Sequence, residues 1–264
     1  MAIQDGIIKF TGSIKGIRNF KKLHDPKIYA SEKGDLSHDT VMTHPNFANT
    51  RLSICEFTGC AKAVKGIRHG FSHLIPEMVD DGFTARLMKF TRELSSMDVD
   101  GKKGQRSYLF SAAHSSLQAL VFNKKRKAIE SAIMAFSGSH SDSRVETTLE
   151  VKNLTMRSTA IPSGAEGYRV LSHLSIVSDY RYSEDKKCYE PTNPLDGLSA
   201  YAYSEFANPG DVFTTKLIVA FPEGTVIGDD CTIVHCVAIE FFVSGGISGM
   251  QPIYGPSLAM MDVF

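Results

Sequence analysis

The sequence predicts an α+β protein in which an N-terminal β-arm and a helical layer are attached to an antiparallel, jelly-roll-like β-sandwich. Three observations support this prediction. The hydrophobic period is two near the N-terminus, lengthens to three or four from about residue 44, and returns to two from about residue 117. These changes divide the 264 residues into a β-arm at 1–43, a helical region at 44–116 and a β-sandwich domain at 117–264.

The β-arm begins with the stretch GIIKFTGSIKGI, which starts at Gly6. Ile8, Phe10 and Ile14 share one parity, and lysine and hydroxyl side chains occupy the other. This alternation is typical of a strand with one apolar face. A turn near Asp25 and Pro26 separates this strand from a second one in KIYASEK.

The helical region contains three apolar stripes at helical spacing, which predict amphipathic helices packed on another layer. The first stripe comprises Phe47, Ile54, Phe57, Ala61 and Val64, the second Phe71, Leu74, Ile75, Met78 and Val79, and the third Phe83, Leu87, Phe90, Leu94 and Met97.

The sandwich domain alternates strand-like segments with turns rich in Gly, Pro, Asn and Asp, as antiparallel sandwiches do. The expected strands are LQALVFN, VETTLEVKNLTM, YRVLSHLSIVSDYRY, DVFTTKLIVAF, CTIVHCVAIEFFV and SLAMMDVF.

Composition narrows the classes of function. The 29 Lys and Arg residues equal the 29 Asp and Glu residues, which argues against a nucleic-acid binder and favours self-association. The N-terminus has no secretory signal pattern, and no apolar stretch reaches the 18 residues or so that a transmembrane helix needs. We therefore expect a chain made in the cytoplasm, and export by a non-classical route stays open.

One set of side chains resembles a metal site. His69, His73 and Glu77 would share one face of a continuous helix, and two histidines four residues apart can bind zinc. Pro76 would weaken the helix at the third ligand, so a solvated polar face is the simpler interpretation. We expect no metal and no cofactor.

The cysteine spacing and the absence of known catalytic motifs predict no catalytic site. The spacing within the pairs Cys55/Cys60 and Cys231/Cys236 sends their side chains in different directions on a helix or strand, so we expect buried, inert thiols. No nucleophile elbow, P-loop or dinucleotide fingerprint is present, and we expect no enzyme. Five tyrosines could line a carbohydrate-binding surface, namely Tyr180, Tyr182, Tyr189, Tyr201 and Tyr203.

Several segments, taken in order, resemble a family of uncharacterised Bacteroidota proteins. They are GIIKFTGSIKGI, HPNFANTR, EFTGCAKAVKGIRHGF, FTARLMKFTRELSSMD and the closing CVAIEFFVSGGISGMQPIYGPSLAMMDVF. The chain departs from the family at YASEKGDLS and at Asn19, where an aromatic residue is usual. The resemblance implies a shared architecture and carries no activity or site residue.

These observations favour a structural protein, a subunit that assembles with itself into a filament or tube by strand exchange through its termini. The residues expected to carry assembly are Ile8, Phe10, Ile14, Met260, Val263 and Phe264. An early strand at a chain end can pair with the sheet of another copy or with its own. The alternative function is a β-sandwich module that binds carbohydrate.

Overall fold

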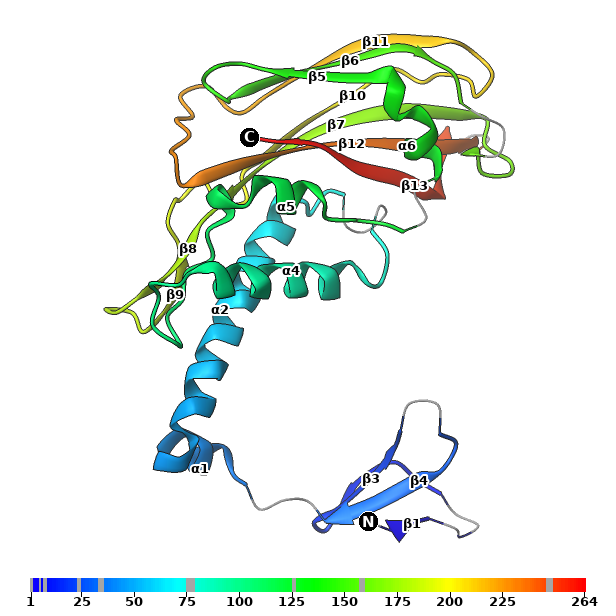
Figure 1. Cartoon of the computed structure of the whole chain (residues 1–264). Helices are drawn as coiled ribbons and strands as arrows, with labels where there is room; N and C mark the ends of the chain where they lie inside the picture. The colour runs from blue at the N-terminus through cyan, green and yellow to red at the C-terminus, as the bar shows by residue number, and fades with distance from the viewer. Residues whose placement is uncertain are drawn as a thin grey trace. The chain divides into compact units, whose positions relative to one another are not determined.

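The computed structural model describes residues 2–4, 6, 9–22, 25–32, 36–74, 79–124, 127–156, 160–245 and 249–264 (Figure 1). The chain divides into two compact units, Met1–Arg51 and Leu52–Phe264, which are described separately below. The division at 43/44 and 116/117 stays a prediction.

The first unit is a small antiparallel sheet followed by two short helices. Its strands are β1 (Ala2–Ile3), β2 (Gly12–Ile14), β3 (Ile17–Lys21) and β4 (Ile28–Glu32), in the order β1-β4-β3-β2. Lys15 and Gly16, both with positive φ, form the two-residue turn between β2 and β3. After the sheet come α1 (His38–Thr43), with Ser37 as its N-cap, and the 3₁₀ helix η1 (Pro45–Phe47).

The strand predicted to start at Gly6 is shorter than expected. Lys9–Thr11 are not in a strand, and pairing begins at Gly12. Ile8 lies outside the described residues. The second strand, predicted in KIYASEK, is present as β4.

Two long helices dominate the helical layer of the second unit, α2 (Ala48–Gly70) and α4 (Phe83–Met97). The α4 stripe is confirmed at Phe83, Leu87 and Leu94, which are buried. The α2 stripe is confirmed at Val64, which is buried, but is wrong at Ile54, Phe57 and Ala61, which are exposed. The residues that α2 buries begin only at its midpoint, namely Gly59, Cys60, Ala63, Val64, Ile67 and Gly70.

Shorter helical segments connect this layer to the strands. They are η2 (Phe110–Ala112), α5 (His114–Gln118), α6 (Lys127–Ala132) and η3 (Ile133–Ala135). The strand expected in LQALVFN is therefore wrong, since Leu117 and Gln118 end α5 and Ala119–Asn123 form no strand. The second stripe is not helical where it is described, because Phe71–Leu74 form turns.

The sandwich consists of two antiparallel sheets, and the helices cover the larger one (Figure 1). The larger sheet has the order β10-β7-β12-β13, with β7 (Gly167–Ser178), β10 (Ser199–Tyr203), β12 (Cys231–Ser244) and β13 (Met250–Val263). The smaller has the order β11-β6-β5, with β5 (Phe136–His140), β6 (Glu146–Leu154) and β11 (Phe213–Ala220). A ribbon of β8 (Tyr180–Ser183) and β9 (Cys188–Pro191) extends from them.

The core has two levels, and this explains the burial of the central strands. One level lies between the helices and the larger sheet, and the other lies between the two sheets. β12 is buried on both faces from Cys231 to Phe242, so its sequence is mostly apolar rather than alternating, with Thr232, His235 and Glu240 as buried polar exceptions. The α+β class and the antiparallel β-sandwich are confirmed.

Candidate functional site

Three glycines let α2 lie unusually close to the sandwich. A Cβ atom added to Gly59 would overlap the ring of Tyr189, one added to Gly66 would overlap the hydroxyl of Tyr180, and one added to Gly70 would overlap the hydroxyl of Ser175. Only glycine permits such an approach of backbone to side chain. The second half of α2 is therefore fixed against the larger sheet and the β8–β9 ribbon.

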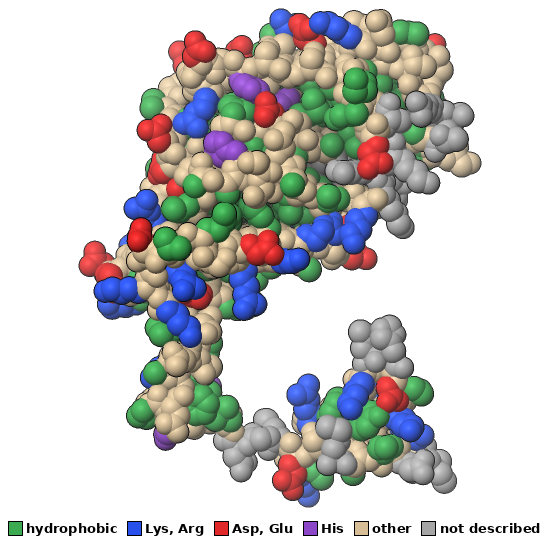
Figure 2. Space-filling view, viewed as in Figure 1, with side chains coloured by type: hydrophobic (Ala, Val, Ile, Leu, Met, Phe, Trp, Pro, Cys, Tyr) green, Lys and Arg blue, Asp and Glu red, His purple; other side chains and the backbone are tan. Residues whose placement is uncertain are grey.

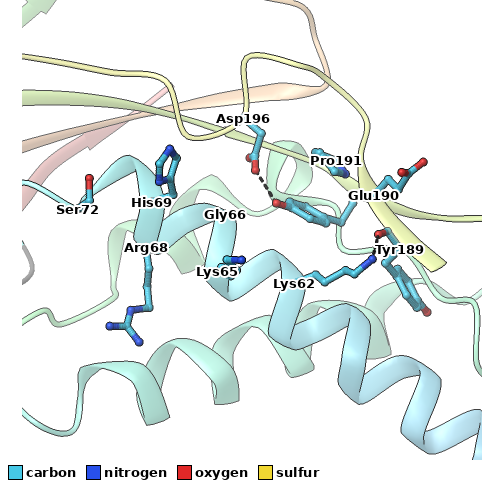
Figure 3. Close-up of a pocket in the computed structure, with 11 residues that line it drawn as sticks. Lys62, Lys65, Gly66, Arg68, His69, Ser72, Tyr189, Glu190, Pro191 and Asp196 are labelled. Carbon is cyan, nitrogen blue, oxygen red and sulfur yellow. Dashed lines mark hydrogen bonds between the residues drawn. The ribbon is translucent and has the colours of Figure 1, made fainter.

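A groove of about 740 Å³ follows this contact, and we call it the tyrosine groove (Figure 3). Tyr180 Oη donates a 2.5 Å hydrogen bond to Asp196 Oδ2, and Asp196 Oδ1 accepts from the Ser178 amide at 2.9 Å. Burial raises the pKa of Asp196 above its ordinary value, against the lowering effect of these hydrogen bonds. Burial also raises the pKa of Tyr180 strongly, so the phenol stays neutral and acts as a donor.

Cationic side chains from α2 form one side of the tyrosine groove. Lys62 Nζ donates to the Tyr189 carbonyl at 3.1 Å, whereas Arg68 extends away from the Tyr180–Asp196 pair (Figure 3). Lys65 and His69 complete this side. The arrangement offers donors and positive charge, and its buried carboxyl group is already hydrogen-bonded within the protein.

A second groove, of about 640 Å³, lies between α2 and α4, and we call it the interhelical groove. Its apolar lining comes from Phe57, Cys60, Met88 and Tyr108. Its charged lining comes from Glu56, Lys89, Arg92 and Arg106. The groove thus combines an apolar floor with a largely cationic rim.

The three residues of the suggested metal face do not act together. His69 lies in the last turn of α2 and lines the tyrosine groove, while His73 lies in the turn that follows the helix. The His73 ring stacks on Tyr201 at a centroid distance of 4.2 Å and hydrogen-bonds with the Tyr203 hydroxyl. Glu77 lies outside the described residues. Within the described ranges, no group of three or more His, Cys, Asp or Glu side chains could hold a metal ion.

The five tyrosines do not form one surface. Tyr180 and Tyr189 are core residues, and Tyr182 and Tyr203 are partly buried against the same core. Tyr201 and Tyr203 reach the surface of the larger sheet, but His73 covers the ring of Tyr201 and the Arg169 guanidinium lies 3.7 Å from the ring centroid of Tyr203. Because these ring faces are already in contact, the arrangement gives little support to a carbohydrate platform.

The residues expected to carry assembly fall into two groups. Phe10 and Ile14 are exposed in the first unit. Val263 is buried opposite Val234, Met260 packs on the core between helices and sheet, and Phe264 exchanges backbone hydrogen bonds with Ile233. The apolar C-terminal side chains thus stabilise their own subunit.

All five cysteines are free thiols. Cys60, Cys231 and Cys236 are buried, while Cys55 and Cys188 are half-buried. Burial raises the pKa of Cys60 to about 11 and that of Cys231 to about 12. Thiolate reactivity at these two positions is therefore suppressed at neutral pH.

Comparison with known proteins yields no match: no family model fits the chain, and neither a curated protein nor a solved structure is significantly similar to it. The resemblance to a Bacteroidota family therefore stays a prediction. No helix among the described residues has both the length and the apolar character needed to cross a membrane.

Proposed function

We propose that the protein is a non-catalytic structural subunit that assembles with further copies of itself, and that the first-unit sheet makes the connecting contact. One observation carries the proposal: this sheet has almost no core. Among the described residues of its four strands, only Asn19 and Ile28 are buried. Sheets this small rarely hold together without disulfides, metals or a partner.

The two faces of the sheet both carry apolar side chains. Ile14 and Ile17 are paired across the β2–β3 hairpin and are 53% and 47% exposed. On the other face, Phe20 pairs with Tyr29 across β3 and β4, and the two rings stack at 6.0 Å. Sheets with apolar residues on both faces are typically covered on both.

Burial of these side chains in a neighbour would supply association energy. Fully burying an isoleucine contributes about 1.5–3 kcal/mol, and Ile14 and Ile17 are each about half exposed. Each would add about 1 kcal/mol on docking. The first half of α2 adds a further apolar surface, formed by Ile54 and Phe57, the latter 63% exposed.

Deletion of Met1–Lys22 tests the proposal, because it removes β1, β2 and β3. Sedimentation velocity and negative-stain microscopy should show assemblies for the full chain and much weaker assembly for the shortened chain, with the sandwich's circular dichroism signal preserved. The variant Ile14→Ser/Ile17→Ser should weaken assembly in the same direction. Lys9→Ser is the control, since Lys9 is exposed and lies outside the four strands of the sheet.

Two results would contradict the proposal. A full chain that sediments as a 29.0 kDa monomer across concentrations would remove the function itself. Normal assembly of the shortened chain would show that contacts elsewhere connect the copies.

A further inference from the structure

The net charge of the whole chain is zero, but basic residues are in excess in the N-terminal part and acidic residues in the C-terminal part. Residues 1–116 contain 17 basic and 12 acidic residues, whereas residues 117–264 contain 12 basic and 17 acidic residues. The N-terminal part is therefore +5 and the sandwich part −5. Within the second unit, Lys and Arg side chains gather over the helical layer (Figure 2). Opposite charges on two parts of one chain favour head-to-tail contact between copies.

The interhelical groove is the place in this basic layer where charge and apolar surface coincide. Among the described residues, the guanidinium groups of Arg92 and Arg106 form no ion pair, although the pKa of Asp98 is lowered by hydrogen bonds from backbone amides and, to a smaller extent, by the Arg106 charge. Lys89 approaches Glu93 only at 3.8 Å on an exposed surface. Phe57 and Met88 line the groove beside them. A fitting occupant therefore has an apolar tip flanked by carboxylates.

The loop between β11 and β12 has this chemistry. Val226 is 81% exposed, and Glu223 and Asp229 beside it are also exposed. The loop is held in place by Arg144, whose guanidinium donates to the carbonyls of Gly228 at 2.8 Å and Ile227 at 3.3 Å. An ordered loop loses little conformational entropy on binding.

We propose that the interhelical groove of one copy receives the β11–β12 loop of a second copy, with Val226 on the apolar floor and Glu223 and Asp229 facing Arg92 and Arg106. The contact joins two different surfaces, so it repeats from copy to copy and forms an open polymer if the rotation does not close. This inference rests on the proposed self-assembly and specifies a contact separate from the first-unit sheet.

The test uses two charge-reversed variants of the full chain. The groove variant is Arg92→Glu/Arg106→Glu, and the loop variant is Glu223→Lys/Asp229→Lys. In each variant, groove and loop carry like charges, so self-association at low salt should weaken at least tenfold. In an equimolar mixture each groove meets a loop of opposite charge, so assembly should return as an alternating polymer.

Lys216→Glu is the control, because Lys216 is exposed on β11, outside the groove and the loop. Circular dichroism establishes that each variant is folded. Sedimentation velocity at 20 and 500 mM NaCl provides the readout, since salt screens such contacts. Wild-type assembly with weakened variants and a restored mixture supports the contact.

Three outcomes would overturn it. If both variants assemble as the wild type does, this contact is wrong while the proposed function stands. If the mixture stays dissociated although both variants are folded, the groove does not receive this loop. If the wild type itself is monomeric, the proposed function fails first, and the contact fails with it.

Discussion

A close contact between α2 and the β8–β9 ribbon predicts a large effect from one methyl group. In Gly66→Ala, the new Cβ would overlap the Tyr180 hydroxyl and lie 3.1 Å from Tyr180 Cζ. The Asp196 carboxylate also lies against this position, so the 2.5 Å hydrogen bond between the two side chains must break or shift. Tyr180 is buried, and the ring has little room to withdraw.

The magnitude follows from three contributions. Overpacking a close contact costs about 1–3 kcal/mol. Losing a hydrogen bond to a charged group costs about 1.5–3 kcal/mol. Alanine gains about 1 kcal/mol over glycine inside a helix. Together they predict a loss of about 1.5–5 kcal/mol in the free energy of unfolding.

Urea denaturation followed by circular dichroism measures this loss, at a concentration where copies are dissociated. Gly210→Ala is the control, because a Cβ there meets nothing within 4 Å, and its effect should stay below about 1 kcal/mol. In Gly66→Ala/Tyr180→Phe the overlapping hydroxyl is absent. The double variant should therefore lose less stability than the two single variants lose in total. If Gly66→Ala is as stable as the wild type, or more stable, the gain in helix propensity outweighs the overlap with Tyr180, and the reasoning is refuted.

Three further predictions concern ionisable groups. Burial lowers the pKa of His173 to about 3 and that of His235 to about 4, so both stay neutral in the folded protein. In the unfolded chain both histidines have pKa values near 6.5 and take up protons first as the pH falls. Urea denaturation should therefore show that the free energy of unfolding decreases below about pH 6.5, by roughly 1.4 kcal/mol per pH unit for each histidine, until the pH reaches the folded-state pKa values. His173→Asn should flatten this dependence, and an unchanged slope would contradict it. Arg169→Ala should lower the free energy of unfolding by about 3 kcal/mol, because it leaves the mostly buried Glu240 without the ion-pair partner that lies 2.6 Å away. Arg169→Lys should restore only part of this stability, since a lysine does not make the ring contacts of the guanidinium. Full recovery in Arg169→Lys would argue that those ring contacts do not stabilise the fold. In native protein a thiol reagent should modify the half-buried Cys55 and Cys188 quickly and the buried Cys60, Cys231 and Cys236 slowly. Fast modification of all five cysteines would show that the core opens.

The sequence predicted the sheet layers better than the helical faces. Strands of alternating character, such as β6 and β11, are buried on one face, so their period is visible directly. For α2, the stripe through Ile54 and Phe57 looked like a core face, yet the buried face is the one that carries Gly59, Ala63 and Gly70. Small residues score low in a hydrophobic pattern, although here they allow the closest packing.

The candidate site was harder to predict, because its parts come from distant segments. Tyr180, Asp196 and Gly66 meet only after β7, β8 and α2 are packed, and no spacing reveals that. The charge separation was visible in the sequence, but it appears only when charges are counted for each predicted segment instead of the whole chain. Over the whole chain the 29 basic and 29 acidic residues balance, so the total gives no sign of the separation.

In the proposed assembly, the charge separation and the exposed first-unit sheet would have complementary effects. A subunit that is +5 in one part and −5 in the other adds no net charge to a polymer, so self-repulsion does not accumulate as copies join. Each head-to-tail contact still brings unlike charges together, and this orients the copies and speeds their encounter more than it stabilises them. Stability must then come from apolar burial, which the first-unit sheet and the exposed half of α2 can supply. The charged groove contact would then act mainly on orientation and the first-unit sheet mainly on stability, and high salt should slow assembly more than it dissolves polymers already formed.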